Sequence, residues 1–321
     1  MTVTAPAAVH TARLSDAPLP PVDPERPPWP GDVVRAGGAE LFVRRTPGPE
    51  TGGEPAVYVH GLGGSATNWT DLAHLLSGRL CGEAVDLPGF GRSGPAPGLD
   101  YTPAGHARTV ISYLEHRGGE PVHLFGNSLG GAVTVLVAAL RPDLVRTLTL
   151  VSPAMPSLRP RRGSDVTLPL LLMPGLGRLV QRRLDALPPQ RRARAVIELC
   201  FGDPSAVPHN RFAEAVEEVV RRRGVPWAMD AFTASLRGIA WSYAAPGARS
   251  LWRQVARVRA PSLVVWGDRD RVVSAALAPR TAATLPDARL LLLPGIGHVA
   301  QMEVPEVVAR AVVALLEDAA G

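Results

Sequence analysis

The feature that most constrains the fold is a regular alternation of short apolar runs with longer amphipathic stretches between residues 56 and 152. Short apolar runs bounded by Gly or Pro indicate buried strands, and apolar residues at helical spacing indicate helices. Strands that alternate with helices form βαβ units, whose right-handed crossovers produce a parallel sheet. The expected strands are residues 56–60, 80–86, 121–126 and 145–152, and the expected helices are residues 68–78, 102–119 and 130–142.

The alternation stops near Pro153 and returns near the C-terminus, where strands are expected at 261–267 and 288–295 and a closing helix at about 304–319. The interval between has the composition of helices broken by Pro and Gly, so it is expected to form a cap inserted between two strands. Two short strands around Gly37 and Gly38 are expected to form a hairpin. The expected divisions are a Pro-rich extended arm (1–30), the first part of an α/β core (31–153), a helical cap (154–250) and the second part of the core (251–321).

The composition suits helices packed on a buried sheet, because 46% of the 321 residues are hydrophobic and only 5% are aromatic. The formal charge is +5, and all 34 basic residues are Arg. The Arg clusters, such as Arg221 to Arg223, are accompanied by no aromatic interleaving and no nucleic-acid motif. We therefore interpret them as solvated helix faces and expect no nucleic-acid partner.

The cysteine positions and the hydropathy of the chain argue against a metal-binding protein, a secreted protein and a membrane-spanning protein. Cys81 and Cys200 lie far apart without metal-ligand spacing, so no metal site is expected. The N-terminus lacks the charged start and apolar stretch of a signal peptide, and the chain has no run of about 18 apolar residues. These features favour a cytoplasmic protein without an integral membrane segment, and they leave its oligomeric state open.

The central motif is Gly126-Asn127-Ser128-Leu129-Gly130, which matches G-x-S-x-G directly after an expected strand and directly before an expected helix. In that setting the serine sits on a strained turn, and the flanking glycines leave room for the backbone. The bare motif is weak evidence, and its position between strand and helix makes it strong. Ser128 is therefore the candidate nucleophile.

A serine hydroxyl needs a base to take its proton, and the base needs an acid to fix its tautomer. Of eight histidines, His298 is the best candidate, because it follows the last expected strand and preserves the chain order serine, acid, histidine. Asp268 and Asp270 both follow the strand at 261–267. We select Asp270 as the acid and interpret Asp268 as a turn or N-cap residue.

Negative charge on the substrate oxygen needs preorganised donors. The Gly-rich loop after residues 56–60, with glycines at 61, 63 and 64, lets the backbone approach a ligand closely. The backbone N–H groups of Leu62 and Leu129 are therefore the expected oxyanion hole.

With these residues in view, the chain resembles the α/β-hydrolase superfamily from about Val33 onward. The motifs that carry the resemblance occur in family order: HGLGGS at 60–65, DLPGFGRS at 86–93, GNSLGG at 126–131, WGDRDRVV at 266–273 and GHVAQMEVP at 297–305. The resemblance implies an eight-stranded, mostly parallel sheet flanked by helices, a helical cap over the nucleophile and no cofactor.

Within that superfamily, GNSLGG and WGDRDRVV look most like carbon–carbon bond hydrolases of aromatic ring-fission products, and also like capped esterases. The ring-fission enzymes typically have Trp after the catalytic histidine, whereas this chain has Val299. A serine at the turn between strand and helix, where the nucleophile is expected, argues against epoxide hydrolases and haloalkane dehalogenases, which form their covalent ester on a carboxylate.

The cap is expected to select the substrate. Its segment 166–180 is strongly apolar, and candidate substrate-binding residues are Trp227, Met229, Phe232, Trp241 and Val299. The favoured function is hydrolysis of an apolar small-molecule ester through a covalent acyl-enzyme. The alternatives are a carbon–carbon bond hydrolase, an acyltransferase or cofactor-free peroxidase with the same triad, and a non-catalytic binding protein on the same fold.

Overall fold

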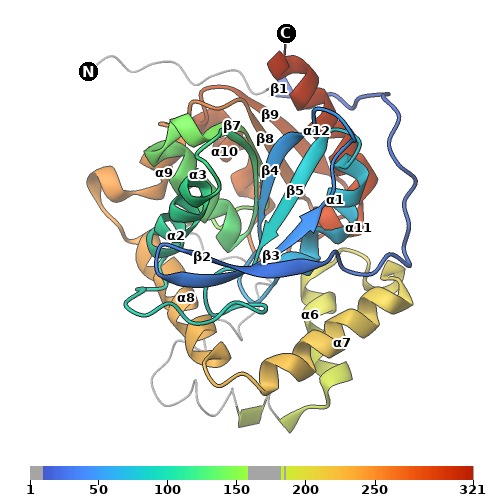
Figure 1. Ribbon diagram of the computed structural model, residues 1–321, viewed down its shortest axis with the longest axis vertical. Helices are drawn as coiled ribbons and strands as arrows, with labels where there is room; N and C mark the ends of the chain where they lie inside the picture. Colours follow the sequence, from blue (N-terminus) through green and yellow to red (C-terminus); the bar gives the residue numbers. More distant parts are fainter. Residues whose placement is uncertain (1–9, 158–181, 184–185, 321) are drawn as a thin grey trace.

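The computed structural model describes residues 10–157, 182–183 and 186–320, and it contains a nine-stranded sheet in the order β1-β9-β8-β7-β6-β4-β5-β3-β2 (Figure 1). The antiparallel hairpin of β2 and β3 joins β5 antiparallel, and the remaining neighbours are parallel. The strands are β1 His10–Thr11, β2 Gly31–Ala36, β3 Ala39–Thr46, β4 Glu54–Val59, β5 Leu80–Val85, β6 Val122–Asn127, β7 Val145–Val151, β8 Ser262–Gly267 and β9 Ala288–Leu293. The α/β prediction is thus confirmed, with all eight expected strands and one more.

Helices cover both faces of the sheet, because alternate residues of each central strand point to opposite faces. In β4, Val57 and Val59 join one apolar cluster, whereas Ala56 and Tyr58 join the other. One face carries α2 Pro103–His116, α3 Leu129–Leu140, α9 Leu251–Val255 and α10 Ala278–Thr284, and the opposite face carries α1 Thr70–Leu76, α11 Ala300–Glu303 and α12 Pro305–Ala320 (Figure 1).

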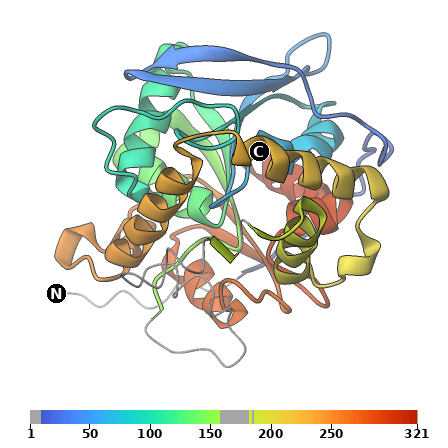
Figure 2. The same ribbon diagram turned by 90° about the horizontal axis from the view of Figure 1, so that it is seen from below.

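The described chain between β7 and β8 is helical. It contains α6 Pro189–Cys200, α7 His209–Arg223 and α8 Ala228–Tyr243, which lie together beyond one end of the sheet. Figure 2, seen from that end, shows α6 and α7 on one side and α8 on the other. The apolar segment 166–180 lies outside the described residues. Among the helices that are described, none is long and apolar enough to cross a bilayer.

The described part of the Pro-rich arm, residues 10–30, is extended and packs along the core. Its residues His10 and Thr11 pair in parallel with β9, which gives the sheet its ninth strand. Further along, the Ser15 hydroxyl donates to Glu317 of α12 (2.7 Å), and the Trp29 indole donates to the carbonyl of Thr70 in α1 (3.2 Å). The carbonyl of Arg26 accepts from Arg211 of α7. The arm therefore connects the β9 edge of the sheet with the cap.

Candidate active site

Ser128 occupies a strained turn between β6 and α3. Its φ of 54° and ψ of −116° lie in a region that L-residues rarely adopt. The flanking glycines make this turn possible: a Cβ at Gly126 would lie 2.4 Å from Oγ1 of Thr134, and one at Gly130 would lie 2.2 Å from the carbonyl oxygen of Val59. The G-x-S-x-G spacing therefore reflects close packing of the turn against the sheet and against its own helix.

His298 and Asp270 meet in a buried hydrogen bond, with Nδ1 of His298 2.8 Å from Oδ2 of Asp270. Oδ1 of Asp270 accepts from the backbone N–H groups of Val272 (2.8 Å) and Val273 (2.9 Å). Burial opposes the charged carboxylate, but the neighbouring imidazole and these N–H groups outweigh burial and lower the pKa of Asp270. Asp270 is therefore ionised at neutral pH and can hold a proton on Nδ1 of His298.

The hydrogen bond determines the role of the second ring nitrogen. Because Nδ1 of neutral His298 donates to Asp270, Nε2 carries the lone pair and can accept a proton. Asp268 lies in the same loop but faces elsewhere, since its Oδ1 accepts from the N–H of Gly295 (2.7 Å). The structure thus brings Asp270, and not Asp268, to the imidazole.

Asn127 connects the serine turn with the histidine loop. Its side-chain amide donates to the carbonyl oxygens of Val151 and His298, each at 3.1 Å. In the G-x-S-x-G motif, Asn127 occupies a variable position. Its amide beside the expected nucleophile was the one signal that could have identified it.

The Gly-rich loop after β4 lies against Ser128, since a Cβ at Gly61 would be 3.0 Å from Cβ of Ser128. His60 orients this loop: its Nε2 accepts from the N–H of Leu87 (2.9 Å), so its Nδ1 donates to the carbonyl of Gly61 (2.7 Å). Burial lowers the pKa of His60, which keeps the ring in this neutral form. Leu62 of the loop faces the cavity above Ser128.

Leu129 is the first residue of α3, and its side chain is fully buried. Backbone N–H groups in the first turn of a helix have no partner within the helix, so they are available to a ligand. The structure therefore places both residues of the expected oxyanion hole next to Ser128, Leu62 in the loop and Leu129 at the helix start.

Ser128 and His298 line one cavity of about 200 Å³ between the core and the cap helices α6 and α7. One wall is apolar, because Ile197 of α6 and Phe201, which directly follows α6, pack with Val299 next to the histidine. Other lining residues with apolar side chains are Leu62, Ala193, Val196, Ala215, Val219 and Met302.

Another part of the cavity lining carries ion pairs. Arg211 of α7 bonds the carboxylates of Asp71 and Glu214, and Arg222 bonds Glu218 and the carbonyl of Gly63. Burial opposes ionisation of Glu218, but its bonds to neighbouring arginines outweigh burial and lower its pKa. Both cavity arginines are thus paired with carboxylates. In the described part of the chain, no cluster of side chains could hold a metal ion.

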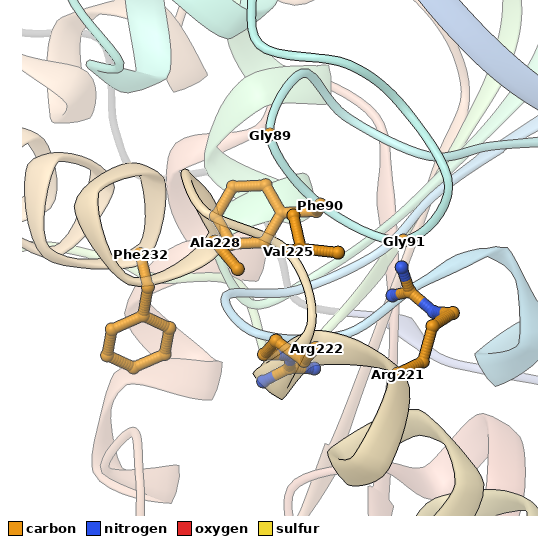
Figure 3. Close-up of a pocket in the computed structure, with 8 residues that line it drawn as sticks. All are labelled: Gly89, Phe90, Gly91, Arg221, Arg222, Val225, Ala228 and Phe232. Atoms are coloured by element: carbon orange, nitrogen blue, oxygen red, sulfur yellow. The ribbon is translucent and has the colours of Figure 1, made fainter.

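Of the expected substrate-binding residues, the structure brings Val299 into this cavity and leaves the other four outside its described lining. Trp241 is 73% exposed on α8, and Trp227, just before α8, is also exposed. Met229 is half-buried on the same helix. Phe232 lines a separate hollow of about 10 Å³ with Phe90 and Arg222 (Figure 3). These four residues lie outside the cavity because of where the cap helices pack. Helices α6 and α7 lie over Ser128, whereas α8 packs on α2 of the core.

The sheet, the serine turn, the His298–Asp270 pair and the cavity that joins them define an α/β serine hydrolase. The chain belongs to the alpha/beta hydrolase fold family, whose sequence profile matches residues 55–305.

Known proteins similar to this chain have different activities. The dihydrolipoyllysine-residue acetyltransferase component of the acetoin cleaving system of Pseudomonas putida is 32% identical over 83% of this chain and 64% of its own length. This chain thus spans less than two thirds of that relative. The 2-hydroxy-6-oxononadienedioate/2-hydroxy-6-oxononatrienedioate hydrolase of Cupriavidus pinatubonensis is 26% identical over 83% of this chain and 87% of its own length. A membrane phospholipase A described as a bacterial virulence factor superposes with a TM-score of 0.72 at 25% identity, over 91% of this chain and 87% of its own.

Proposed function

We propose that the chain is an esterase for a small-molecule ester with an apolar acyl group of medium size. Ser128 is the nucleophile, His298 the general base, and Asp270 the acid that orients the base. The backbone N–H groups of Leu62 and Leu129 bind the oxyanion. The observation that carries this proposal is the buried His298–Asp270 bond beside Ser128, in a cavity with one apolar wall.

The proposed reaction follows from the proton positions. Nε2 of His298 takes the proton of the Ser128 hydroxyl while its oxygen attacks the ester carbonyl, and the carboxylate of Asp270 stabilises the resulting imidazolium. Collapse of the tetrahedral intermediate passes this proton to the leaving alcohol and forms an acyl-enzyme on Ser128. Water then attacks the acyl-enzyme with His298 as base, which releases the acid and restores the serine.

The apolar wall supports an aliphatic acyl chain. Ile197, Phe201 and Val299 offer no hydrogen-bonding side chain, and each methylene buried against such a surface contributes about 0.8 kcal/mol. Catalytic efficiency toward p-nitrophenyl esters should therefore rise from acetate to about C4–C8, by at most a few-fold for each added methylene.

Carbon–carbon bond hydrolysis is the second candidate, because a relative that spans most of this chain acts, by its name, on a dienedioate ring-fission product. Such a substrate carries carboxylates, which favour an unpaired cation. Among the described lining residues, Arg211 and Arg222 both already bond carboxylates, and Val299 stands beside the histidine. These features favour the ester.

A kinetic screen tests the proposal. Purified protein is assayed with p-nitrophenyl esters of increasing acyl length, with one dienoic ring-fission product, and with alcohol acceptors added to separate hydrolysis from acyl transfer. Cleavage of the ring-fission product hundreds of times faster than any ester would establish the second candidate. Ester consumption that depends on an added alcohol would establish a transferase.

Ser128→Ala tests the nucleophile and should lower ester turnover by about 10⁴-fold or more, because only the oxyanion hole and binding remain. Ser65→Ala is the matched control, since this buried serine lines the same cavity and bonds the Thr67 hydroxyl. A fluorophosphonate should label the wild type at Ser128 alone. Labelling at another residue would contradict the assignment.

A further inference from the structure

Glu303 joins two segments that are distant in the sequence. Its carboxylate accepts hydrogen bonds from the backbone N–H groups of Gly202 (3.0 and 3.1 Å), Asp203 (3.0 Å) and Gly297 (2.9 Å). Gly202 and Asp203 follow α6 in the cap, whereas Gly297 immediately precedes His298 in the core. Hydrogen bonds to a charged acceptor are stronger than those between neutral groups, so Glu303 forms a firm connection between cap and core.

The two segments also meet directly through their backbones. The N–H of His298 donates to the carbonyl of Cys200 at the last residue of α6 (2.6 Å). A Cβ at Gly202 would lie 2.1 Å from the carbonyl oxygen of Gly295, and one at Gly297 would lie 2.3 Å from that of Cys200. Only glycine fits at both positions, so no side chain separates the end of α6 from the histidine loop.

The side chains at the end of α6 and directly after it face the same site. Ile197 and Phe201 form an apolar cluster with Val299, the residue after the histidine. The end of α6 thus contacts the histidine loop on both sides of His298, through Gly297 before it and Val299 after it. A shift of this end of the cap would move the backbone that carries the imidazole.

We propose that Glu303 is a positioning residue that makes the end of α6 and the loop of His298 move as one unit. The inference rests on the proposed role of His298 as general base. Glu303 does not line the cavity, so it acts through the backbone of Gly297. A ligand that presses on Ile197 or Phe201 therefore changes the alignment of Nε2 with the Ser128 hydroxyl.

Glu303→Gln is the sharpest variant, because it keeps the shape but leaves one acceptor oxygen. Oε1 accepts from Asp203, Oε2 accepts from Gly297, and both reach Gly202, so an amide loses the hydrogen bond from either Asp203 or Gly297. The bonds that remain go to an uncharged acceptor and are weaker, so the connection between the two segments is weakened in either orientation of the amide. We expect kcat for p-nitrophenyl butyrate to fall by about 10- to 100-fold. The KM should change by less than about three-fold, because the cavity wall itself is unchanged.

The matched control is Glu306→Gln, three positions along the chain, where the glutamate side chain bonds only Arg310 among its described contacts in α12. This control should keep wild-type kcat and KM. A folded Glu303→Gln variant with wild-type kcat, or with a raised KM as its only change, would overturn the proposal. A purely structural role would lower the stability of the protein and leave kcat unchanged.

Native-state hydrogen exchange of the wild type tests the same coupling without a variant. The amides of Gly202, Asp203 and Gly297 should exchange with one opening free energy, since all three bond one carboxylate. Exchange of Gly297 at a different opening free energy from Gly202 and Asp203 would overturn the proposal even if Glu303→Gln fails to fold. If the wild type hydrolyses no ester, the proposed function fails, and the exchange result still decides whether the two segments are coupled.

Discussion

Exchange of Asp270 for Asn is the most informative single change, because the two oxygens of this side chain have different partners. Oδ1 accepts from the N–H groups of Val272 and Val273, and Oδ2 accepts from Nδ1 of His298. In Asp270→Asn the amide oxygen must stay with the two backbone donors. The amide NH₂ then faces the imidazole.

This arrangement reverses the hydrogen bond to His298. An NH₂ group only donates, so Nδ1 must present its lone pair and the ring proton moves to Nε2. His298 then lacks an acceptor for the proton of Ser128. The same exchange in a serine protease lowers kcat by about 10⁴-fold, which corresponds to about 5.4 kcal/mol of transition-state stabilisation. KM should change little, because Asp270 does not line the cavity.

Asp268→Asn is the matched control, since Asp268 lies two positions away and bonds only the N–H of Gly295 among the contacts described for its side chain. We expect it to change kcat by no more than a few-fold. Both variants are assayed with p-nitrophenyl butyrate near pH 8, and circular dichroism verifies that each is folded. A greater loss in Asp268→Asn, or less than about a 100-fold loss in a folded Asp270→Asn protein, would refute the assignment.

Further predictions concern stability and chain length. Burial lowers the pKa of His106 from 6.5 to about 3, so the unfolded chain binds a proton that the folded chain does not, and stability is lost as the pH falls from 6.5 towards 3. His106→Gln should remove about 2 to 3 kcal/mol of that loss at pH 4.5 in urea titrations, and an unchanged pH slope would contradict this. Gly130→Ala should destabilise the fold by about 3 kcal/mol or more, because its Cβ would lie 2.2 Å from the Val59 carbonyl, whereas Gly78→Ala, whose Cβ meets nothing within 4 Å, should be tolerated in thermal melts. Ile197→Ala should weaken the preference for octanoate over acetate esters by about 1 to 2 kcal/mol, measured as a ratio of kcat/KM, and an unchanged ratio would exclude Ile197 from the acyl site.

Much of the core follows from local sequence signals. Strands β4 to β9 are short apolar runs bounded by Gly, Pro or polar residues, and such boundaries depend on neighbours in the sequence. The serine turn is equally local, because Gly126 and Gly130 are needed wherever a strand turns this tightly into a helix. His298 and Asp270 could be proposed because each follows an expected strand and together they preserve the chain order serine, acid, histidine.

The cap could not be predicted in the same way. Which helix stands over Ser128 depends on how α6, α7 and α8 pack, and their sequences do not encode that placement locally. Aromatic content suggested Trp227 and Trp241, which are exposed, whereas Ile197 and Phe201, at the end of α6 and just after it, line the cavity. Glu303 belongs to the family motif at 297–305, but its hydrogen bonds could not be predicted from the sequence, because they join two distant segments of the chain.

The pairing of β1 with β9 gives the order of synthesis a physical consequence. Thr11 pairs with Leu290, and Ser15 bonds Glu317, so the arm can complete these contacts only after the C-terminal helix has left the ribosome. During translation the arm is therefore not yet fully bound while the sheet assembles. Until it binds, β9 presents a free edge to other nascent chains, and a slow ribosome would lengthen that exposure.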